Sequence, residues 1–309
     1  IKGCSLLIPP SLSKLLQHVE RWQQLDPRGQ RSHTSPKHDR EKGAPGANVA
    51  LLETCPETVV IDTLVIVSHL ARSSADYYNS ILEVGMTREI RALLWVPSGV
   101  VRAKVCNLIG NLCKHSDTFY EILIEPLEPF QFDGDSCSDP WLARACDRLH
   151  RGHSHNLLSH LIVHCKDPDS NTRKFACFAV GNAAFHSPFL YPQLENSIPL
   201  LVNTLESDED NKTRANAAGA LGNLVRNSDE LCQALVNAGA PEALLNAAME
   251  SGPDCVQPRR ISLFSLGNFC VYDICRRRLL SSGSAEDNHS LNHLMERVRN
   301  ESDDTLVQK

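Results

Sequence analysis

The stretch TRANAAGALGNLVRNS, residues 213–228, decides the fold, because altered copies of it recur along the chain. At about 3.6 residues per helical turn, its larger apolar side chains fall on one stripe: Ala217, Leu221, Leu224 and Val225. The small residues Ala218, Gly219 and Gly222 leave room for neighbouring helices to approach closely. The stretch therefore predicts a helix that is packed on nearly all sides.

Three further copies align without gaps on the pair Gly222-Asn223. They are VRAKVCNLIGNLCKHS (101–116), TRKFACFAVGNAAFHS (172–187) and PRRISLFSLGNFCVYD (258–273). The four copies share a glycine, the asparagine after it and an arginine eight residues before it: Gly110, Gly181, Gly222 and Gly267; Asn111, Asn182, Asn223 and Asn268; Arg102, Arg173, Arg214 and Arg259. A degenerate copy, VIDTLVIVSHLARSS, has Ser68-His69 in place of Gly-Asn and Val60 in place of the arginine.

The spacing of the copies is nearly constant. From Ser68 to Gly110 there are 42 residues, then 71 to Gly181, 41 to Gly222 and 45 to Gly267. A period near 42 is interrupted once, by an extra segment of about 29 residues, and periods of about 40 to 47 are typical of helical solenoids. We therefore predict an all-α solenoid of about four to five repeats.

Each repeat is expected to contain three helices. The segments 74–94 and 228–250 align with each other, and each has a helix, a turn at Gly85 or Gly239, and a second helix. The Gly-Asn helix follows as the third. Three helices per unit fit this order better than two.

The arginine row is predicted to be structural. An arginine in the first turn of a helix opposes the helix dipole, so a compensating carboxylate or the carbonyl end of a preceding helix is expected beside it. The loops just ahead of Arg173 and Arg214 supply carboxylates and helix caps: Asp167, Asp169, Asp208, Glu209 and Asp210.

The asparagines form the candidate binding site. One asparagine per repeat at the same helical phase predicts a row along the solenoid: Asn111, Asn182, Asn223 and Asn268. A carboxamide can donate to and accept from a peptide backbone at once, so such a row can hold an extended segment. Alternatively, each asparagine bonds the backbone of a neighbouring repeat and pins the stacking. The residues leave both interpretations open.

Composition excludes several classes of function. The 309 residues carry a net charge of −6, whereas broad nucleic-acid binding needs a concentrated basic face. No apolar run reaches the ~18 residues of a membrane span, and the best one, 59–67, contains Asp62. We expect a monomer that binds proteins or extended peptides.

The cysteines indicate a reducing, intracellular compartment. Four of the twelve are expected inside apolar helices, where cysteine behaves as a small hydrophobe: Cys106, Cys113, Cys177 and Cys270. The spacing of the twelve does not indicate a disulfide framework.

A metal-binding module is the alternative from a different class. The densest set of possible ligands is Cys137, Cys146, His150, His153, His155, His160, His164 and Cys165. His160 and His164 would share a helix face, and zinc takes four nitrogen or sulfur ligands. Because the first two cysteines are nine residues apart and no Cys-x-x-Cys accompanies them, a polar loop and a helix surface are favoured, and we assign no metal site.

Catalytic signatures are missing from the sequence. It contains no Gly-x-Gly-x-x-Gly loop, no phosphate-binding Gly-x-x-x-x-Gly-Lys-Ser/Thr and no Gly-x-Ser-x-Gly elbow. Phe132-Asp133-Gly134 resembles one kinase motif, without the others around it. We expect no catalytic residue and no cofactor in this segment.

The predicted organisation has three parts. Residues 1–48 are rich in proline, glycine and charge and are expected to be a disordered linker or tail. A solenoid is predicted over 49–300, with a loop inserted at about 125–154 and a cap formed by 274–280 and 291–299; residues 301–309 are expected to be a disordered tail. Because the chain opens on Ile1, we expect a fragment of a longer protein or an incomplete gene model.

The pattern R-x-x-x-A-x-x-A-L-G-N-L at this period resembles the third helix of armadillo repeats. The resemblance implies a right-handed, armadillo/HEAT-like solenoid in which this helix lines a concave face and its asparagines clamp extended peptides. Peptide-binding members of the family place tryptophan four residues before the asparagine. This chain has Asn107, Phe178, Gly219 and Phe264 there, which makes Phe178 and Phe264 the aromatic candidates for partner binding.

A closer likeness covers residues 101–116 and 174–283. VRAKVCNLIGNLCKHSDTFY, RKFACFAVGNAAFHS and TRANAAGALGNLVRNSDELC resemble the C-terminal armadillo region of Fused-type serine/threonine kinases. In that family a kinase domain, which uses ATP and magnesium, precedes repeats that dock partners in Hedgehog signalling, axonemal assembly or cytokinesis. The resemblance implies a non-catalytic scaffold in the cytoplasm or on the cytoskeleton; a generic armadillo cargo adaptor unrelated to kinases is the alternative within this class.

Overall fold

The computed structural model describes residues 57–126, 140–142, 144–145 and 156–281. Within these ranges all regular structure is helical and no strand occurs. The same ranges hold no helix with the length and apolar character needed to traverse a bilayer.

The helices group into repeat units. The first described helix is α2 (Glu57–Ser73), and the next unit contains η2 (Ala75–Tyr77), α3 (Tyr78–Val84), α4 (Thr87–Leu93) and α5 (Gly99–Leu112). Then come α6 (Tyr120–Ile124), α8 (Leu157–Val163), η3 (His164–Lys166) and α9 (Ser170–Ala183). The fourth unit has η4 (Pro188–Leu190), α10 (Tyr191–Leu194), η5 (Glu195–Ser197), α11 (Ile198–Ser207) and α12 (Asn211–Asn223). The fifth has α13 (Cys232–Asn237), α14 (Ala240–Met249), η6 (Pro253–Cys255) and α15 (Val256–Phe269), and α16 (Asp273–Ser281) follows.

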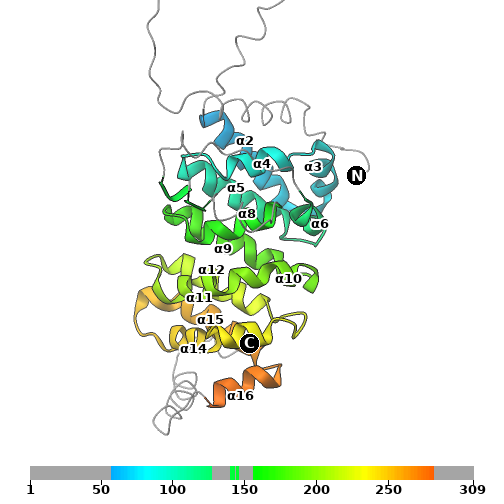
Figure 1. The fold of residues 1–309 in the computed structure, drawn as a ribbon. Helices are drawn as coiled ribbons and strands as arrows, with labels where there is room; N and C mark the ends of the chain where they lie inside the picture. The colour runs from blue at the N-terminus through cyan, green and yellow to red at the C-terminus, as the bar shows by residue number, and fades with distance from the viewer. Residues whose placement is uncertain (1–56, 127–139, 143, 146–155, 282–309) are drawn as a thin grey trace, which may run out of the picture.

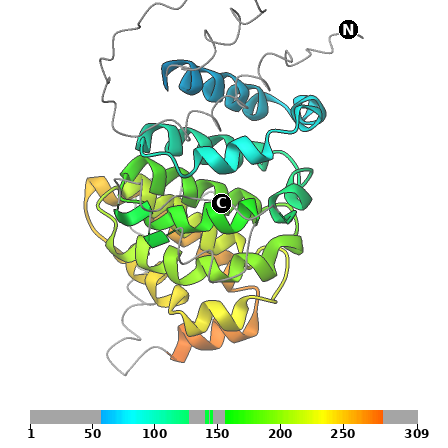
Figure 2. The ribbon, with the colours of Figure 1, turned by 45° about the horizontal axis from the view of Figure 1, so that its top comes forward.

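The five helices that carry the repeated motif stack on one another. α2 contacts α5, α5 contacts α9, α9 contacts α12, and α12 contacts α15. The stack runs from the blue end of the ribbon to the orange end in Figure 1, and the turned view in Figure 2 keeps this order. In the last two units the second helices, α11 and α14, contact each other and the motif helix of their own unit. The predicted all-α solenoid is confirmed.

Two glycines make the turn between the first and second helices of a unit. Gly85 follows α3 with φ of 66°, and Gly239 precedes α14 with φ of 77°. Both values lie in the left-handed region, where a side chain is strained and glycine is not. This explains why the two positions match when the units are aligned.

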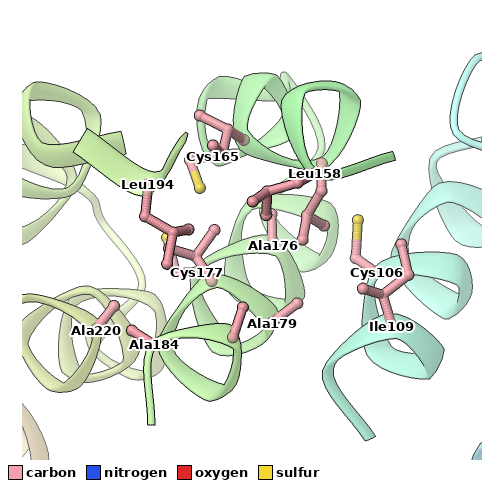
Figure 3. Packing of buried hydrophobic residues seen from close by; sticks show 14 of the residues in the cluster. Cys106, Ile109, Leu158, Cys165, Ala176, Cys177, Ala179, Ala184, Leu194 and Ala220 are labelled. Atoms are coloured by element: carbon pink, nitrogen blue, oxygen red, sulfur yellow. The ribbon is translucent and has the colours of Figure 1, made fainter. Parts of the chain in front are cut away.

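Small side chains line the contacts between α9 and its two neighbouring motif helices and let these helices approach closely. Figure 3 shows Ala176 and Ala179 of α9 between Cys106 of the preceding motif helix and Ala220 of the following one. All four side chains are completely or almost completely buried. Cys106 therefore packs as a small hydrophobe, as predicted.

Aspartates in the acidic loops start the motif helices. Asp169 Oδ2 accepts a hydrogen bond from the Thr172 N–H at 2.7 Å, and Asp210 Oδ2 accepts one from the Thr213 N–H at 3.1 Å. A side-chain acceptor at this position satisfies one of the free N–H groups of the first turn. The helix start in these units is thus encoded locally.

Several predictions fall on other residues. The proposed tails, 1–48 and 301–309, the cap helix at 291–299 and most of the inserted loop at 125–154 lie outside the described residues. The first part of the predicted cap is present as α16. Cys270 differs from the expectation, because it follows α15 directly and is exposed, whereas Cys113 and Cys177 are buried.

Candidate interaction surface on the stacked helices

The motif glycines lie where one motif helix touches the next. A Cβ atom on Gly222 would lie 2.6 Å from the Cβ of Ser265 on α15, and one on Gly181 would lie 3.3 Å from the Cα of Ala220 on α12. Gly267, on the last motif helix described, would meet nothing within 4 Å. Glycine is thus needed where a further helix packs on it, because a methyl group would occupy the space of the neighbour.

The asparagines join consecutive units. Each amide N–H group donates to the carbonyl oxygen of the glycine one unit earlier: Asn182 to Gly110 at 2.8 Å, Asn223 to Gly181 at 2.9 Å and Asn268 to Gly222 at 3.1 Å. Asn111 donates to the hydroxyl of Ser68, which stands in the glycine position of α2, at 2.8 Å. The stacking role that the sequence left open is therefore present at all four positions.

In three of the four asparagines these contacts use the side-chain nitrogen and leave the side-chain oxygen available as an acceptor. Asn182, Asn223 and Asn268 are partly exposed, and their amide oxygens accept no hydrogen bond from the described residues. Asn111 differs because it is buried and contacts Asn107 as well. Three of the four asparagines thus keep an acceptor on the surface.

A second ladder runs parallel to the first and was missed from the sequence. The residue four positions after the asparagine bonds a main-chain carbonyl of the preceding unit: His115 Nε2 to Arg72 O at 2.7 Å, His186 Nε2 to Lys114 O at 3.0 Å and Asn227 Nδ2 to Phe185 O at 3.0 Å. The signal was the penultimate position of the aligned copies, His, His and Asn before serine.

Tyrosines close the C-terminal ends of three motif helices. Their hydroxyls donate to the main-chain oxygen of the asparagine in the same unit: Tyr78 to Asn111 at 2.7 Å, Tyr120 to Asn182 at 2.8 Å and Tyr191 to Asn223 at 2.6 Å. Each hydroxyl also accepts a hydrogen bond from the main-chain N–H of the residue four positions after that asparagine. Burial raises the pKa of all three phenols. Carbonyls at a helix end have no partner within the helix, so the tyrosine satisfies one of them.

Three arginines of the row bridge their unit to the following one, whereas Arg259 donates to the main-chain oxygen of Glu250 in its own unit. Arg102 pairs with Asp167, Arg173 with Asp208 and Arg214 with Glu250. Arg173 also donates to the main-chain oxygens of Asp167 and Pro168 in its own unit. The predicted carbonyl partners thus come from the same unit. The carboxylates, expected from the loop just ahead of each arginine, come instead from the loop of the next unit.

Arg102, Asp167 and His164 form a buried cluster. Arg102 Nη2 and Nε lie 2.7 and 2.8 Å from the Asp167 carboxylate, and His164 Nδ1 lies 2.8 Å from it. Burial would raise the pKa of Asp167, but hydrogen bonds from His164 and Arg102 lower it overall. Burial lowers the pKa of His164 despite the nearby carboxylate. At neutral pH both directions favour an uncharged His164 imidazole beside an ionised Asp167 carboxylate.

The histidine-rich stretch is only partly within the described residues, which exclude Cys137, Cys146, His150, His153 and His155. His160 and His164 are buried, and they have different partners, because His160 Nδ1 accepts from the Trp95 indole N–H at 2.7 Å. The described residues contain no group of three potential ligands arranged to hold a metal ion.

One exposed face of the motif helices is continuous across the units. Positions −11, −7, −4, 0 and +3 relative to the asparagine share one side of a helix. We call these positions, the last of which lies just past the end of each of α5, α9, α12 and α15, the asparagine stripe: Val100, Lys104, Asn107, Asn111, Lys114; Asn171, Phe175, Phe178, Asn182, Phe185; Lys212, Asn216, Gly219, Asn223, Arg226; Gln257, Ile261, Phe264, Asn268, Val271. All except Asn111 are partly or fully exposed.

The two predicted aromatic residues differ in their surroundings. A Cβ atom on Gly110 would lie 2.6 Å from the ring of Phe178, so this ring covers the preceding motif helix. Phe264 is 58% exposed. Phe264 is therefore the side chain that a partner can reach without moving the stack.

Comparisons with known proteins agree with this geometry. A family model described as an Armadillo/beta-catenin-like repeat matches residues 195–226, which include α11 and α12. The serine/threonine-protein kinase TIO of Arabidopsis thaliana is 36% identical over 243 residues, and the serine/threonine-protein kinase 36 of Pongo abelii is 28% identical over 245 residues. These alignments cover 75% and 77% of this chain, which spans 16% of the length of either relative.

Solved structures show the same fold at low sequence identity. A designed armadillo repeat protein in complex with the peptide (KR)4 superposes with a TM-score of 0.62 at 14% sequence identity. The alignment covers 96% of this chain and 95% of the designed chain. A second designed armadillo repeat protein has a TM-score of 0.61 at 15% identity, covering 96% and 94%. The architecture of stacked three-helix units is common to all three.

Proposed function

Because this chain carries an armadillo-repeat region related in sequence to the Fused-type serine/threonine kinases, we propose that it is a non-catalytic scaffold that binds an extended polypeptide along the asparagine stripe. The observation that carries the proposal is the row of side-chain amides of Asn182, Asn223 and Asn268. Each amide donates a hydrogen bond through its nitrogen, and its oxygen accepts none from the described residues.

The row suits a polypeptide backbone. Motif helices in contact lie about 8 to 10 Å apart, and an extended chain advances about 3.3 Å per residue, so roughly three residues span one unit. One amide oxygen per unit can therefore accept a backbone N–H from about every third residue. Because the nitrogen is fixed by the glycine carbonyl, the oxygen is held in place before the ligand arrives, which lowers the entropy cost of binding.

The relatives give the proposal a context. We place this region in the C-terminal part of a Fused-like kinase, where it docks partners for signalling, axonemal or cytokinetic functions in the cytoplasm or on the cytoskeleton. A kinase domain elsewhere in such a protein would hold ATP and magnesium. The sequence likeness to two serine/threonine kinases favours this context over a cargo adaptor unrelated to kinases.

Selection from a random peptide library tests the proposal. Purified protein is panned against displayed twelve-residue peptides, and enriched peptides are measured by isothermal titration calorimetry. We expect binding to weaken about tenfold in Phe264→Ala, a loss near 1.4 kcal/mol, because an exposed aromatic anchor is removed. Phe189→Ala is the matched control, since Phe189 is 49% exposed and lies outside the stripe.

Two outcomes would contradict the proposal. The first is that the library yields no peptide that binds the protein in solution. The second is that Phe189→Ala and Phe264→Ala weaken peptide binding equally. Circular dichroism of both variants shows whether the fold is retained.

A further inference from the structure

All charged side chains of the asparagine stripe are basic. Its basic residues are Lys104, Lys114, Lys212 and Arg226, and none of its twenty positions is acidic. The whole chain, by contrast, has 37 acidic and 31 basic residues. The twenty stripe positions therefore differ in charge from the chain as a whole, although the matching positions of α2 add one residue of each sign, Asp62 and Arg72.

Within the part of the chain that the structure describes, these basic groups are not neutralised by carboxylates. The described residues place no carboxylate in an ion pair with any of the four, whereas Arg102, Arg173 and Arg214 each have one. Asp169 and Asp210, at the starts of α9 and α12, accept hydrogen bonds as caps. The positive charge of the stripe is thus available to a ligand.

Part of this charge forms an ordered row at the +3 position. Lys114 Nζ donates to the Arg72 main-chain oxygen at 3.1 Å, and the Arg226 guanidinium lies 4.2 Å from the centre of the Phe185 ring. The second ladder fixes the main chain of this row through the carbonyls of Arg72, Lys114 and Phe185. Lys114 and Arg226 lie two units apart beside the amide row, so they match a ligand whose carboxylates have the same separation.

From this charge pattern we infer that the extended segment bound by the stripe is acidic, with carboxylates about six residues apart, the length that spans two units. The inference rests on the proposed function and specifies its ligand. A polypeptide is favoured over a nucleic acid, because the basic residues alternate with apolar ones such as Phe264 and Val271 and the whole chain is negatively charged.

Labelled peptides of matched length test the charge. The probes are the dodecapeptides (EGS)4, (QGS)4 and (KGS)4 and the oligonucleotide dT12, measured by fluorescence anisotropy at low and physiological salt. We expect (EGS)4 to bind at least about tenfold more tightly than (QGS)4 and to weaken as salt screens the exposed charges. No binding is expected for (KGS)4.

Charge reversal locates the site. Lys114→Glu should weaken (EGS)4 roughly five- to tenfold, because one attraction becomes a repulsion at an exposed position. Lys166→Glu is the matched control, since Lys166 is exposed at the end of η3, outside the stripe, and should leave binding unchanged.

The failures are distinguishable. The inference of an acidic ligand is overturned if (QGS)4 or (KGS)4 binds more tightly than (EGS)4, or if dT12 is the only probe that binds. It is also overturned if Lys114→Glu and Lys166→Glu weaken the binding of (EGS)4 equally. If panning then still yields Phe264-dependent peptides of neutral or basic composition, the proposed function stands and only this inference fails. If panning yields none, both fail.

Discussion

Arg102 of one unit and Asp167 of the next form a two-pronged ion pair in which neither side chain is exposed beyond 2%. Removing one partner of such a pair leaves a buried charge without compensation, which costs about 3 to 5 kcal/mol. We therefore expect Arg102→Ala and Asp167→Ala each to lower the free energy of unfolding by this amount in urea denaturation.

The exposed pair Arg277–Asp273 on α16 is the control for this prediction. Arg277→Ala should leave the unfolding curve nearly unchanged, because solvent screens both charges. A similar loss from Arg277→Ala and Arg102→Ala would show that burial of the inter-unit pair does not matter.

The asparagine ladder should contribute to stability. Asn223→Ala removes the hydrogen bond to the Gly181 carbonyl and is expected to lower the free energy of unfolding by about 0.5 to 1.5 kcal/mol relative to Asn203→Ala. Asn203 is exposed on α11, so the control carries the same Asn-to-Ala change without the bond between units. Equal stabilities of the two variants would remove the stacking role.

The tyrosine caps give a third prediction. Tyr191→Phe leaves the Asn223 carbonyl and the Asn227 N–H without their shared partner, so a loss of about 1 to 3 kcal/mol is expected. Tyr77→Phe should change little, because the described residues offer its hydroxyl no hydrogen bond. Thermal unfolding followed by circular dichroism compares the two, and an unchanged melting temperature in Tyr191→Phe contradicts the capping role.

The repeated motif made the stack predictable, whereas contacts between units were harder to infer. Gly222 and Asn223 recur at one period, and a recurring close-packed helix has few arrangements other than a stack. Asp208 lies six residues before Arg214, so it was expected beside that arginine; the solenoid instead brings it to Arg173, 35 residues away. Tyr120 was missed for the same reason, because 62 residues separate it from its partner Asn182.

Acid should destabilise the protein through His164. Its folded pKa lies below the ordinary 6.5, so the unfolded state binds the proton more tightly, and stability is lost as pH falls through 6.5 toward the folded value. The pKa of Asp167 is also lowered, so its contribution is lost only at still lower pH, below 3.8. Urea midpoints from pH 8 to pH 5 should fall less steeply in His164→Asn than in the native protein.

His69→Asn is the control for the pH dependence, since His69 is exposed on α2. It should retain the slope of the native protein. Identical slopes for His164→Asn and the native protein would mean that the buried histidine does not control the acid response.

The most direct test of the stacked architecture compares two glycines by their urea midpoints. Gly222→Ala puts a methyl group against Ser265 of the next motif helix and should cost about 1 to 3 kcal/mol. Gly267→Ala meets nothing within 4 Å and should stabilise by about 0.5 to 1 kcal/mol, because alanine favours a helix over glycine. Opposite signs support motif helices packed in series; the same sign and size at both positions would contradict it.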